Sequence, residues 1–406
     1  MSVDYVAMVG DQPYEVHMTS KERHEARYQR RKAKRQARKE ELNKLYGDFD
    51  KATSYKTLHN IYYKCRLATS WKGSVQKYGI DIMKNTLKIH DMMRAGEDTF
   101  KGFYSFDVCE RGKIRHIRSV HISERCVQKA ICQTSLVPML QNSFIYDNGA
   151  SRKGKGTSFA LDRVTEYLYK YFRYYGDNEG YIVKLDFKGY FDNINHDEIV
   201  KIIDKTFSDK RYVYYIDQTI RHYGDKGLGL GSEENQILAM ALPNDFDHWI
   251  KTVKRIKPYV RYCDDSIIIA RTKDEARQLL SESREYLKKY KIDLNEKKTQ
   301  IIKLSHGFTF LQIKFSLTNT GKVIRRPCRN KIVRERRKLR RLYNAYKRGE
   351  IDRSVIDNQY KTWRGQFRIK QKNIRNHTYK IKHRHLNVYR TVRNMDGFYN
   401  SLFKEE

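Results

Sequence analysis

The sequence predicts an α+β fold, in which helices and short strands are mixed along the chain. Tyr181–Asp186 is typical of a strand that ends in an aspartate, and Tyr259–Ala270 is typical of two strands folded about Cys263-Asp264-Asp265. The run from Ile267 to Ala270 is typical of a buried strand. Segments with apolar residues at helical spacing lie on both sides of them. Of the 406 residues, 39% are hydrophobic and 13% aromatic, which is enough for two or three packed units and excludes a chain that is disordered throughout.

The first predicted element is a basic helix. Residues 1–18 have no clear periodicity, and the capping-box pattern Thr19-x-x-Glu22 then opens a helix that runs to about Leu45. Ten Lys or Arg and no large aliphatic residue lie between Lys21 and Lys39, so the helix has no apolar stripe with which to pack on a core. It is either a solvated arm or a helix laid along nucleic-acid phosphates, and the charge density favours the second interpretation. The nucleic-acid-binding residues expected here are Arg30, Arg31, Lys34 and Arg35.

A hairpin and two helical segments are expected next. The predicted elements are, in chain order, a helical segment over 82–93, strands over 103–108 and 114–120 around a turn at 110–113, and a helix over 125–137. Pro138 is expected to end that helix, because proline removes a backbone donor and clashes with the preceding turn. The cation-rich sequence DNGASRKGKG at residues 147–156 is typical of a loop.

The middle and the end of the chain continue this mixture. After the strands 181–186 and 259–270, the predicted elements are a helix over 273–289, a short segment at 292–294 and a strand over 308–315. After Gly321 a basic helix carries one apolar stripe, formed by Ile332, Leu339, Leu342, Tyr343 and Tyr346. A further helix surrounds Trp363, which is expected to anchor a small helical unit. The remaining C-terminal residues are basic and poorly periodic.

The net charge indicates the kind of partner. The chain has 83 Lys and Arg against 48 Asp and Glu, a formal net charge of +35, which requires a polyanionic partner such as nucleic acid. No run approaches the roughly 18 apolar residues of a membrane-spanning helix, so no membrane partner is expected. The six cysteines are scattered without a C-x-x-C pair, which predicts free thiols in a reducing cytoplasm and no zinc site.

Three aspartates stand out against this positive charge. Asp186 ends the strand Tyr181–Asp186, and Asp264 and Asp265 lie where the segment 259–270 folds back on itself. Carboxylates at the ends of central strands are costly unless they bind a cation. Two Mg²⁺ ions held by three carboxylates can activate a 3′ hydroxyl and stabilise a leaving pyrophosphate. The alternative is that Asp264 and Asp265 only form a hairpin turn, which aspartates favour.

The motifs around these aspartates resemble those of reverse transcriptases. Tyr262-Cys263-Asp264-Asp265 is similar to the YxDD motif of that family, and LDFKGYFDNI (residues 185–194) is similar to its first palm motif, an aspartate followed five residues later by an aromatic. Four more segments match in the expected order: RKGKGTSFAL (152–161), GLGLGSEENQILAMALPNDFDH (227–248), LNEKKTQI (294–301) and GFTFLQIKF (307–315). The resemblance implies a right-hand polymerase with an antiparallel-sheet palm that makes DNA on an RNA template.

The resemblance also implies a role for each matching residue. Asp186, Asp264 and Asp265 would hold two Mg²⁺ ions, with Mn²⁺ as a substitute, and the Phe187 carbonyl would add a ligand. Phe191 would stack under the incoming sugar and exclude a 2′ hydroxyl. The other dNTP-binding residues would be Arg152 and Lys155, which contact the triphosphate, and Gln236, which lies near the nascent base pair. Lys298 would donate a proton to pyrophosphate, and the equal alternative is that Lys298 is a solvated lysine without this role. Arg336 and Arg340, on the basic helix after Gly321, are expected to bind nucleic acid.

Several polar residues near the motifs are expected to be structural. Asp192 and Asn193 are expected to cap the helix that follows the strand, since both residue types favour that position. His196 and Asp197 form a dyad in the sequence, but without a nucleophile nearby they are expected to have no catalytic role. The same expectation holds for Asp247 and His248.

The expected subdomains are an N-terminal extension (1–50), fingers (51–175), a palm (176–320) and a helical thumb with a tail (321–406). The expected partners are an RNA template, dNTPs and the DNA product, and an accessory protein or a second copy of the chain stays open.

Three groups of bacterial enzymes resemble the chain: those of antiphage defence, of diversity-generating retroelements and of group II introns. Asn235 stands where diversity-generating enzymes usually have serine, Gly229 where proline is common and Gln312 where glycine is common. Group II intron enzymes continue into maturase domains. The basic arm favours a defence enzyme, bacterial or phage-encoded, that copies a dedicated structured non-coding RNA. A catalytically idle RNA-binding protein is the alternative of another class, and the three intact aspartates argue against it.

Overall fold

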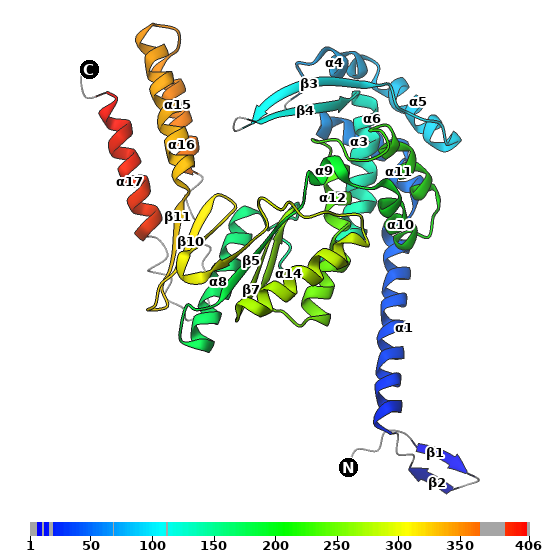
Figure 1. The fold of residues 1–406 in the computed structure, drawn as a ribbon. Helices are drawn as coiled ribbons and strands as arrows, with labels where there is room; N and C mark the ends of the chain where they lie inside the picture. The colour runs from blue at the N-terminus through cyan, green and yellow to red at the C-terminus, as the bar shows by residue number, and fades with distance from the viewer. Residues whose placement is uncertain are drawn as a thin grey trace. The chain divides into compact units, whose positions relative to one another are not determined.

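The computed structural model describes residues 6–9, 12–15, 19–67, 69–110, 113–365 and 386–403. The chain divides into two compact units. The first comprises Met1–Ser143, Ile199–Tyr223 and Leu230–Ile237, and the second comprises Phe144–Glu198, Gly224–Gly229 and Leu238–Glu406. Helices and antiparallel sheets are mixed in the described residues, so the predicted α+β class is confirmed (Figure 1).

The first unit is mostly helical. Its elements are β1 (Val6–Val9), β2 (Gln12–Glu15), α1 (Ser20–Tyr46), α2 (Phe49–Ala52), α3 (Tyr55–Arg66), α4 (Gly73–Ile80), α5 (Ile82–Ala95), β3 (Phe103–Glu110), β4 (Lys113–Val120), α6 (Ile122–Ile131), η1 (Cys132–Leu136), α7 (Val137–Leu140), η2 (Gln141–Ser143), most of α10 (His196–Thr206), α11 (Arg211–Arg221) and the start of α12 (Glu233–Ala241). The hairpin β3–β4 is the predicted one. Residues 111–112 of its turn lie outside the described part of the chain.

Helix α1 begins as the sequence predicts. The Thr19 hydroxyl accepts from the Glu22 N–H, and the Thr19 N–H donates to the Glu22 carboxylate at 2.7 Å, which completes the capping box. No side chain of this helix is buried. Near its end, Asn43 donates to the Thr206 carbonyl at 3.1 Å and accepts from the Ser208 N–H at 2.9 Å. These bonds attach α1 to the end of α10 (Figure 1).

The prediction that Pro138 ends a single helix over 125–137 is wrong. Helix α6 passes through one π-helical turn, η1, and continues as α7. Pro138 lies in the first turn of α7, where the missing proline N–H would have no partner within that helix. A π turn placed before the proline therefore lets the chain remain helical to Leu140.

The second unit is built on an antiparallel sheet of strand order β6-β7-β5-β8. Its elements are α8 (Thr157–Tyr175), β5 (Tyr181–Asp186), α9 (Tyr190–Asn193), α13 (Asn244–His248), η3 (Trp249–Val253), β6 (Tyr259–Tyr262), β7 (Asp265–Ala270), α14 (Lys273–Lys288), β8 (Gln300–Lys303), η4 (Leu304–His306), β9 (Phe308–Phe310), β10 (Ile313–Leu317), β11 (Val323–Pro327), α15 (Arg329–Lys347), α16 (Arg353–Gly365) and α17 (Leu386–Ser401), together with parts of α10 and α12.

Both faces of this sheet are covered, which explains the continuous apolar run in β7. Ile182, Ile267 and Ile269 pack with α8 in one core cluster, which also takes in the second sheet β11-β10-β9. The alternate residues Val183 and Ile268 are equally buried and face the other side, where α14 contacts β5 and β7.

Two smaller predictions need correction. Residues 308–315 form no single strand, because the chain reverses at Leu311 and Gln312, both at positive φ, to make the hairpin β9–β10. The short segment predicted at 292–294 contributes one bridge, between Leu294 and Phe187. Asp192 and Asn193 lie inside α9 and do not cap the next helix; the Asn195 side chain accepts from the Glu198 N–H at 3.2 Å instead.

The terminal helices form their own core. Leu339, Ile356, Tyr360, Trp363 and Met395 are its buried residues, and the predicted stripe of α15 packs in this cluster. Trp363 is therefore the anchor that the sequence predicts. The poorly periodic C-terminal end contains helix α17, which the sequence did not predict, and residues 366–385 lie outside the described part of the chain. None of the described helices is long and apolar enough to cross a membrane.

Candidate active site

The sheet brings two of the three predicted carboxylates face to face. Asp186 is the last residue of β5, and Asp265 is the first residue of β7. The antiparallel register pairs these two residues directly, so their side chains lie on the same face, about 5 Å apart at Cβ. Asp186 is 3% exposed. The apolar strand thus ends in a buried carboxylate beside a second one.

The third carboxylate lies in the turn between β6 and β7. Tyr262 pairs with Asp265, which leaves Cys263 and Asp264 as a two-residue loop. Cys263 has a φ of 59°, in the left-handed region that non-glycine residues rarely adopt. The predicted hairpin is confirmed, with Asp265 belonging to the strand and not to the turn.

Two lysines provide positive charge at these aspartates. The Lys298 Nζ donates to both carboxylate oxygens of Asp186 at 3.0 Å, and this hydrogen bond raises the pKa of Lys298. The Lys184 Nζ lies 3.9 Å from Oδ1 of Asp265. Sequence reasoning named Lys298 but missed Lys184, because a lysine inside the apolar strand YIVKLD gives no signal of its own.

The carboxylates have the chemistry of a cation site, although no complete metal site is assembled. Among the described residues, no group of three or more His, Cys, Asp or Glu is arranged to hold a metal ion. However, Oδ1 of Asp265 is buried and accepts no hydrogen bond from any described residue. Burial raises the pKa of Asp265 to about 6, Lys184 opposes this shift, and Asp264 and Asp186 add to it. A divalent cation would offset the desolvation of the Asp265 charge and its repulsion by Asp264 and Asp186, so the three residues fit such an ion.

Phe187 follows Asp186 on the way out of the strand. The residue is 2% exposed, and its backbone forms an antiparallel bridge with Leu294. The neighbouring Asp186 carbonyl accepts from the Asn295 N–H at 2.7 Å. These contacts hold the backbone after Asp186 against the segment that carries Lys298.

The two predicted triphosphate ligands of the loop 147–156 bond backbone carbonyls just before the loop. Arg152 donates to the Ile145 carbonyl at 2.9 Å, and the Lys155 ammonium donates to the Tyr146 carbonyl. Lys155 also lies over the rings of Tyr146 and Phe159, at 4.3 and 4.5 Å from their centres. Burial among these groups lowers the pKa of Lys155 to about 8.

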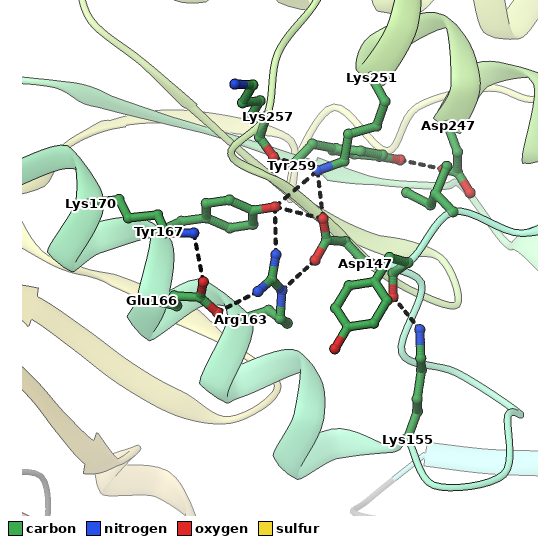
Figure 2. A network of polar contacts seen from close by, with 12 residues as sticks. Asp147, Lys155, Arg163, Glu166, Tyr167, Lys170, Asp247, Lys251, Lys257 and Tyr259 are labelled. Atoms are coloured by element: carbon green, nitrogen blue, oxygen red, sulfur yellow. Dashed lines mark hydrogen bonds and ion pairs between the residues drawn. The ribbon is translucent and has the colours of Figure 1, made fainter. Parts of the chain in front are cut away.

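A buried carboxylate that sequence reasoning missed anchors this loop. Asp147 accepts from Arg163 at 2.5 Å, from the Tyr167 hydroxyl at 2.6 Å and from Lys251 at 2.7 Å (Figure 2). Burial alone would raise the pKa of Asp147, but the hydrogen bonds from Arg163, Lys251 and Tyr167 lower it overall. The sequence showed only an aspartate at the start of a polar loop, a position typical of turns.

Phe191 and Gln236, the remaining predicted nucleotide contacts, are not buried. Phe191 lies on α9, half-buried, and its carbonyl accepts from the Leu228 N–H at 2.8 Å. Gln236 is exposed on α12 and belongs to the first compact unit, whereas the aspartates belong to the second. Asp247 is structural as predicted, since it is fully buried in an ion pair with Arg261. The buried His196 likewise bonds the Gly227 carbonyl at 2.7 Å.

The predicted nucleic-acid contacts differ in their surroundings. Arg30, Arg31, Lys34 and Arg35 are exposed on α1. On α15, Arg336 and Arg340 lie over the ring of Phe398, at 5.1 and 5.3 Å from its centre. These two arginines therefore help to pack α17 on α15.

The family that the sequence matches agrees with the motifs. Residues 98–315 match the family described as reverse transcriptase (RNA-dependent DNA polymerase). Protein YkfC of Escherichia coli (strain K12) is 24% identical over 243 residues, which cover 49% of this chain and 62% of that protein, so the match spans less than two thirds of the relative. Among solved structures, apo telomerase from Candida tropicalis has a TM-score of 0.44 at 14% identity, covering 55% of this chain and 48% of that one. Telomerase from Candida albicans in complex with a TWJ fragment of telomeric RNA has a TM-score of 0.44 at 12% identity, covering 77% and 61%.

Proposed function

The chain belongs to the reverse transcriptase (RNA-dependent DNA polymerase) family, and on that premise we propose that it is an RNA-directed DNA polymerase whose active site is formed by Asp186, Asp264 and Asp265. Its fold is accordingly that of a right-hand polymerase, with the sheet β6-β7-β5-β8 in the palm. The observation that carries the proposal is the direct pairing of Asp186 with Asp265, which Asp264 immediately precedes in the turn. A nucleic-acid-binding protein without catalysis would gain nothing from three carboxylates, one of them buried, that repel phosphates.

The three carboxylates would hold two Mg²⁺ ions, or Mn²⁺, with the Phe187 carbonyl as a further ligand. Bound ions of this kind activate the 3′ hydroxyl and stabilise the charge on the leaving pyrophosphate. In the resting site Lys298 is protonated, because the hydrogen bond to Asp186 raises its pKa. This is the proton that Lys298 would donate to pyrophosphate. Since the Lys298 ammonium bonds both oxygens of Asp186, it also neutralises this carboxylate.

Other residues would select and hold the nucleotide. Phe191 would lie under the incoming sugar and exclude a 2′ hydroxyl, so Phe191→Ala should incorporate ribonucleotides more readily than the natural chain, and equal discrimination would refute this role. Arg152 and Lys155 would contact the triphosphate, since guanidinium and ammonium groups suit phosphate oxygens. Gln236 would lie near the nascent base pair.

Primer extension tests the activity directly. Purified protein with a primed RNA template, Mg²⁺ and dNTPs should synthesise DNA, because the residues above provide the groups that in-line phosphoryl transfer requires. The product is measured by gel electrophoresis, and omission of Mg²⁺ is the control. Absence of DNA synthesis on primed RNA, and also with the RNA that co-purifies, would contradict the proposal and favour an idle RNA-binding protein.

The subdomains would be an N-terminal extension (1–50), fingers (51–175), a palm (176–320) and a thumb with a tail (321–406). In this arrangement α1 would hold the template RNA through Arg30, Arg31, Lys34 and Arg35, which are exposed on a helix that buries no side chain. Arg336 and Arg340 would contact nucleic acid with their outer edges while they pack on Phe398.

Removal of the arm should weaken RNA binding. A chain that lacks residues 1–45 loses ten Lys or Arg between Lys21 and Lys39, and each lost phosphate contact reduces the dependence of affinity on salt. We expect the slope of log affinity against log salt to fall by several units in filter-binding or anisotropy titrations. An unchanged slope would show that the arm does not touch RNA.

The biological role we propose is antiphage defence in the bacterial cytoplasm, with a dedicated structured non-coding RNA as template. The long basic arm supports a dedicated RNA partner. A role in a diversity-generating retroelement or a group II intron is the second candidate, since the loop DNGASRKGKGT resembles the first of these groups. A defence enzyme and a diversity-generating enzyme would both copy a dedicated structured RNA, and sequencing of the RNA and DNA that co-purify would identify this template. Recovery of no specific RNA would contradict a dedicated template.

A further inference from the structure

Arg261 is a fully buried arginine one residue before the YCDD motif. It is 0% exposed, and its guanidinium donates to both carboxylate oxygens of Asp247, with its shortest contact at 2.7 Å. Burial alone would lower the pKa of Arg261, but Asp247 raises it above the usual range, so the side chain is charged. An ion pair alone would account for Nε and one terminal nitrogen, and Arg261 makes further contacts that the pair does not require.

The guanidinium also contacts the Met240 sulfur at 3.9 Å and two backbone carbonyls, one of them in the turn. One terminal nitrogen donates to the Cys263 carbonyl at 3.1 Å, and the other donates to the Met240 carbonyl at 3.0 Å. Cys263 is the residue at positive φ in the two-residue loop. A left-handed conformation at a residue with a side chain persists only when surrounding contacts hold it. Arg261 supplies such a contact to the carbonyl of the strained residue itself.

The backbone of Arg261 joins the turn to the cation-rich loop. Its N–H donates to the Asp147 carbonyl at 3.2 Å, and its carbonyl accepts from the Gly149 N–H at 3.0 Å, so that Asn148 forms a parallel bridge with β6. The Asp147 side chain is fixed in turn by Arg163, Tyr167 and Lys251 (Figure 2). The loop that carries Arg152 and Lys155 is therefore bonded through its first residues to Arg261, in the hairpin that carries Asp264 and Asp265.

We propose that Arg261 is a positioning residue: its guanidinium holds the Cys263 turn in the left-handed conformation, and its backbone fixes the 147–149 segment to strand β6, which leads into that turn. The aspartates of the hairpin and the cations of the loop then keep one geometry relative to each other. The inference rests on the proposed polymerase activity, and it adds a residue that touches neither nucleotide nor metal ion. Because misplacement of reacting groups by about 1 Å can cost about a hundredfold in rate, such a residue has a measurable effect on kcat.

A double-mutant cycle tests the proposal. Arg261→Lys retains the positive charge opposite Asp247, but an ammonium lacks the planar fork that reaches the Cys263 and Met240 carbonyls at the same time. We expect kcat for primer extension to fall about tenfold or more, with KM for dNTP changed less. In a Cys263→Gly background the same substitution should cost less than about threefold, because glycine adopts positive φ without help. The kcat of each Arg261→Lys variant is compared with that of the chain with the same residue at position 263, at a temperature at which both proteins are folded.

Arg325→Lys is the matched control. Arg325 is another mostly buried arginine of the second unit, paired with Asp162 at 2.6 Å, and its replacement should lower the melting temperature without lowering kcat. If Arg261→Lys proves too unstable to assay, Cys263→Val strains the same turn without touching the ion pair, and it should lower kcat by a similar factor. Equal losses in the natural and the Cys263→Gly backgrounds, or an unchanged kcat in Arg261→Lys or in Cys263→Val, would overturn the positioning role. Absence of DNA synthesis by the natural chain would instead overturn the proposed function.

Discussion

Replacement of Asp264 and Asp265 by asparagine is expected to abolish DNA synthesis and leave the fold intact. The amides keep the shape of the carboxylates but carry no negative charge and therefore hold divalent cations only weakly, and the loss of several kcal/mol of transition-state stabilisation lowers the rate about a thousandfold or more. The fold should tolerate the change because burial already disfavours the charge of Asp265, whose pKa is raised to about 6. A raised pKa means that the ionised carboxylate destabilises the folded chain at neutral pH, so its removal should raise the melting temperature of the metal-free protein.

Primer extension and thermal unfolding of the same preparations check both halves of this expectation. Asp177→Asn is the control, because Asp177 is a partly exposed aspartate paired with Arg271 at 2.7 Å and takes no part in the proposed site. That variant should synthesise DNA at the natural rate. DNA synthesis by the double variant within about tenfold of the natural rate would remove Asp264 and Asp265 from the active site.

Replacement of Asp247 by alanine is expected to have the largest effect on stability. Asp247 and Arg261 are both fully buried, and the variant leaves the arginine charge without its partner. Loss of one partner from a buried ion pair costs about 3–5 kcal/mol, because the remaining charge stays desolvated. The Tyr259 hydroxyl, which donates to Asp247 at 2.6 Å, loses its acceptor as well. We expect the free energy of unfolding, measured in urea, to fall by about this amount.

A partly exposed ion pair gives the comparison. Asp217 pairs with Arg221 at 2.8 Å one helical turn away in α11, and neither side chain is buried. Asp217→Ala should therefore change the free energy of unfolding by less than about 1 kcal/mol. If both variants lost equally little stability, Arg261 would not be left as an uncompensated buried charge when Asp247 is removed.

The local features of the site could be predicted from the sequence because each depends on a short pattern. The apolar run before Asp186, the polar break at Cys263 and Asp264, and the apolar run after Asp265 identify two strands and a turn without knowledge of the rest of the chain. The capping box at Thr19 is equally local. The direct pairing of Asp186 with Asp265, in contrast, depends on the sheet register, which joins segments about eighty residues apart.

The contacts that hold the site could not be predicted, because they depend on which charged residues become buried. Asp147, Arg261 and Lys184 have the same residue types as dozens of exposed positions in a chain with a net charge of +35. Only the fold shows that Asp147 meets Arg163 and Lys251, or that Arg261 reaches the carbonyl two residues ahead of it. The π turn before Pro138 could not be predicted either, because a proline inside a helical pattern normally predicts the end of the helix.

Helix α1 has a consequence for how the chain melts. Unfolding of a packed core exposes apolar surface and therefore carries a large heat-capacity change. A helix of 27 residues that buries no side chain exposes almost no new apolar surface when it unwinds. Its melting should be broad and gradual, as for an isolated peptide helix, and should come before the cooperative transition of the two compact units. Calorimetry would then record the cores alone, while far-ultraviolet circular dichroism would begin to fall at lower temperature.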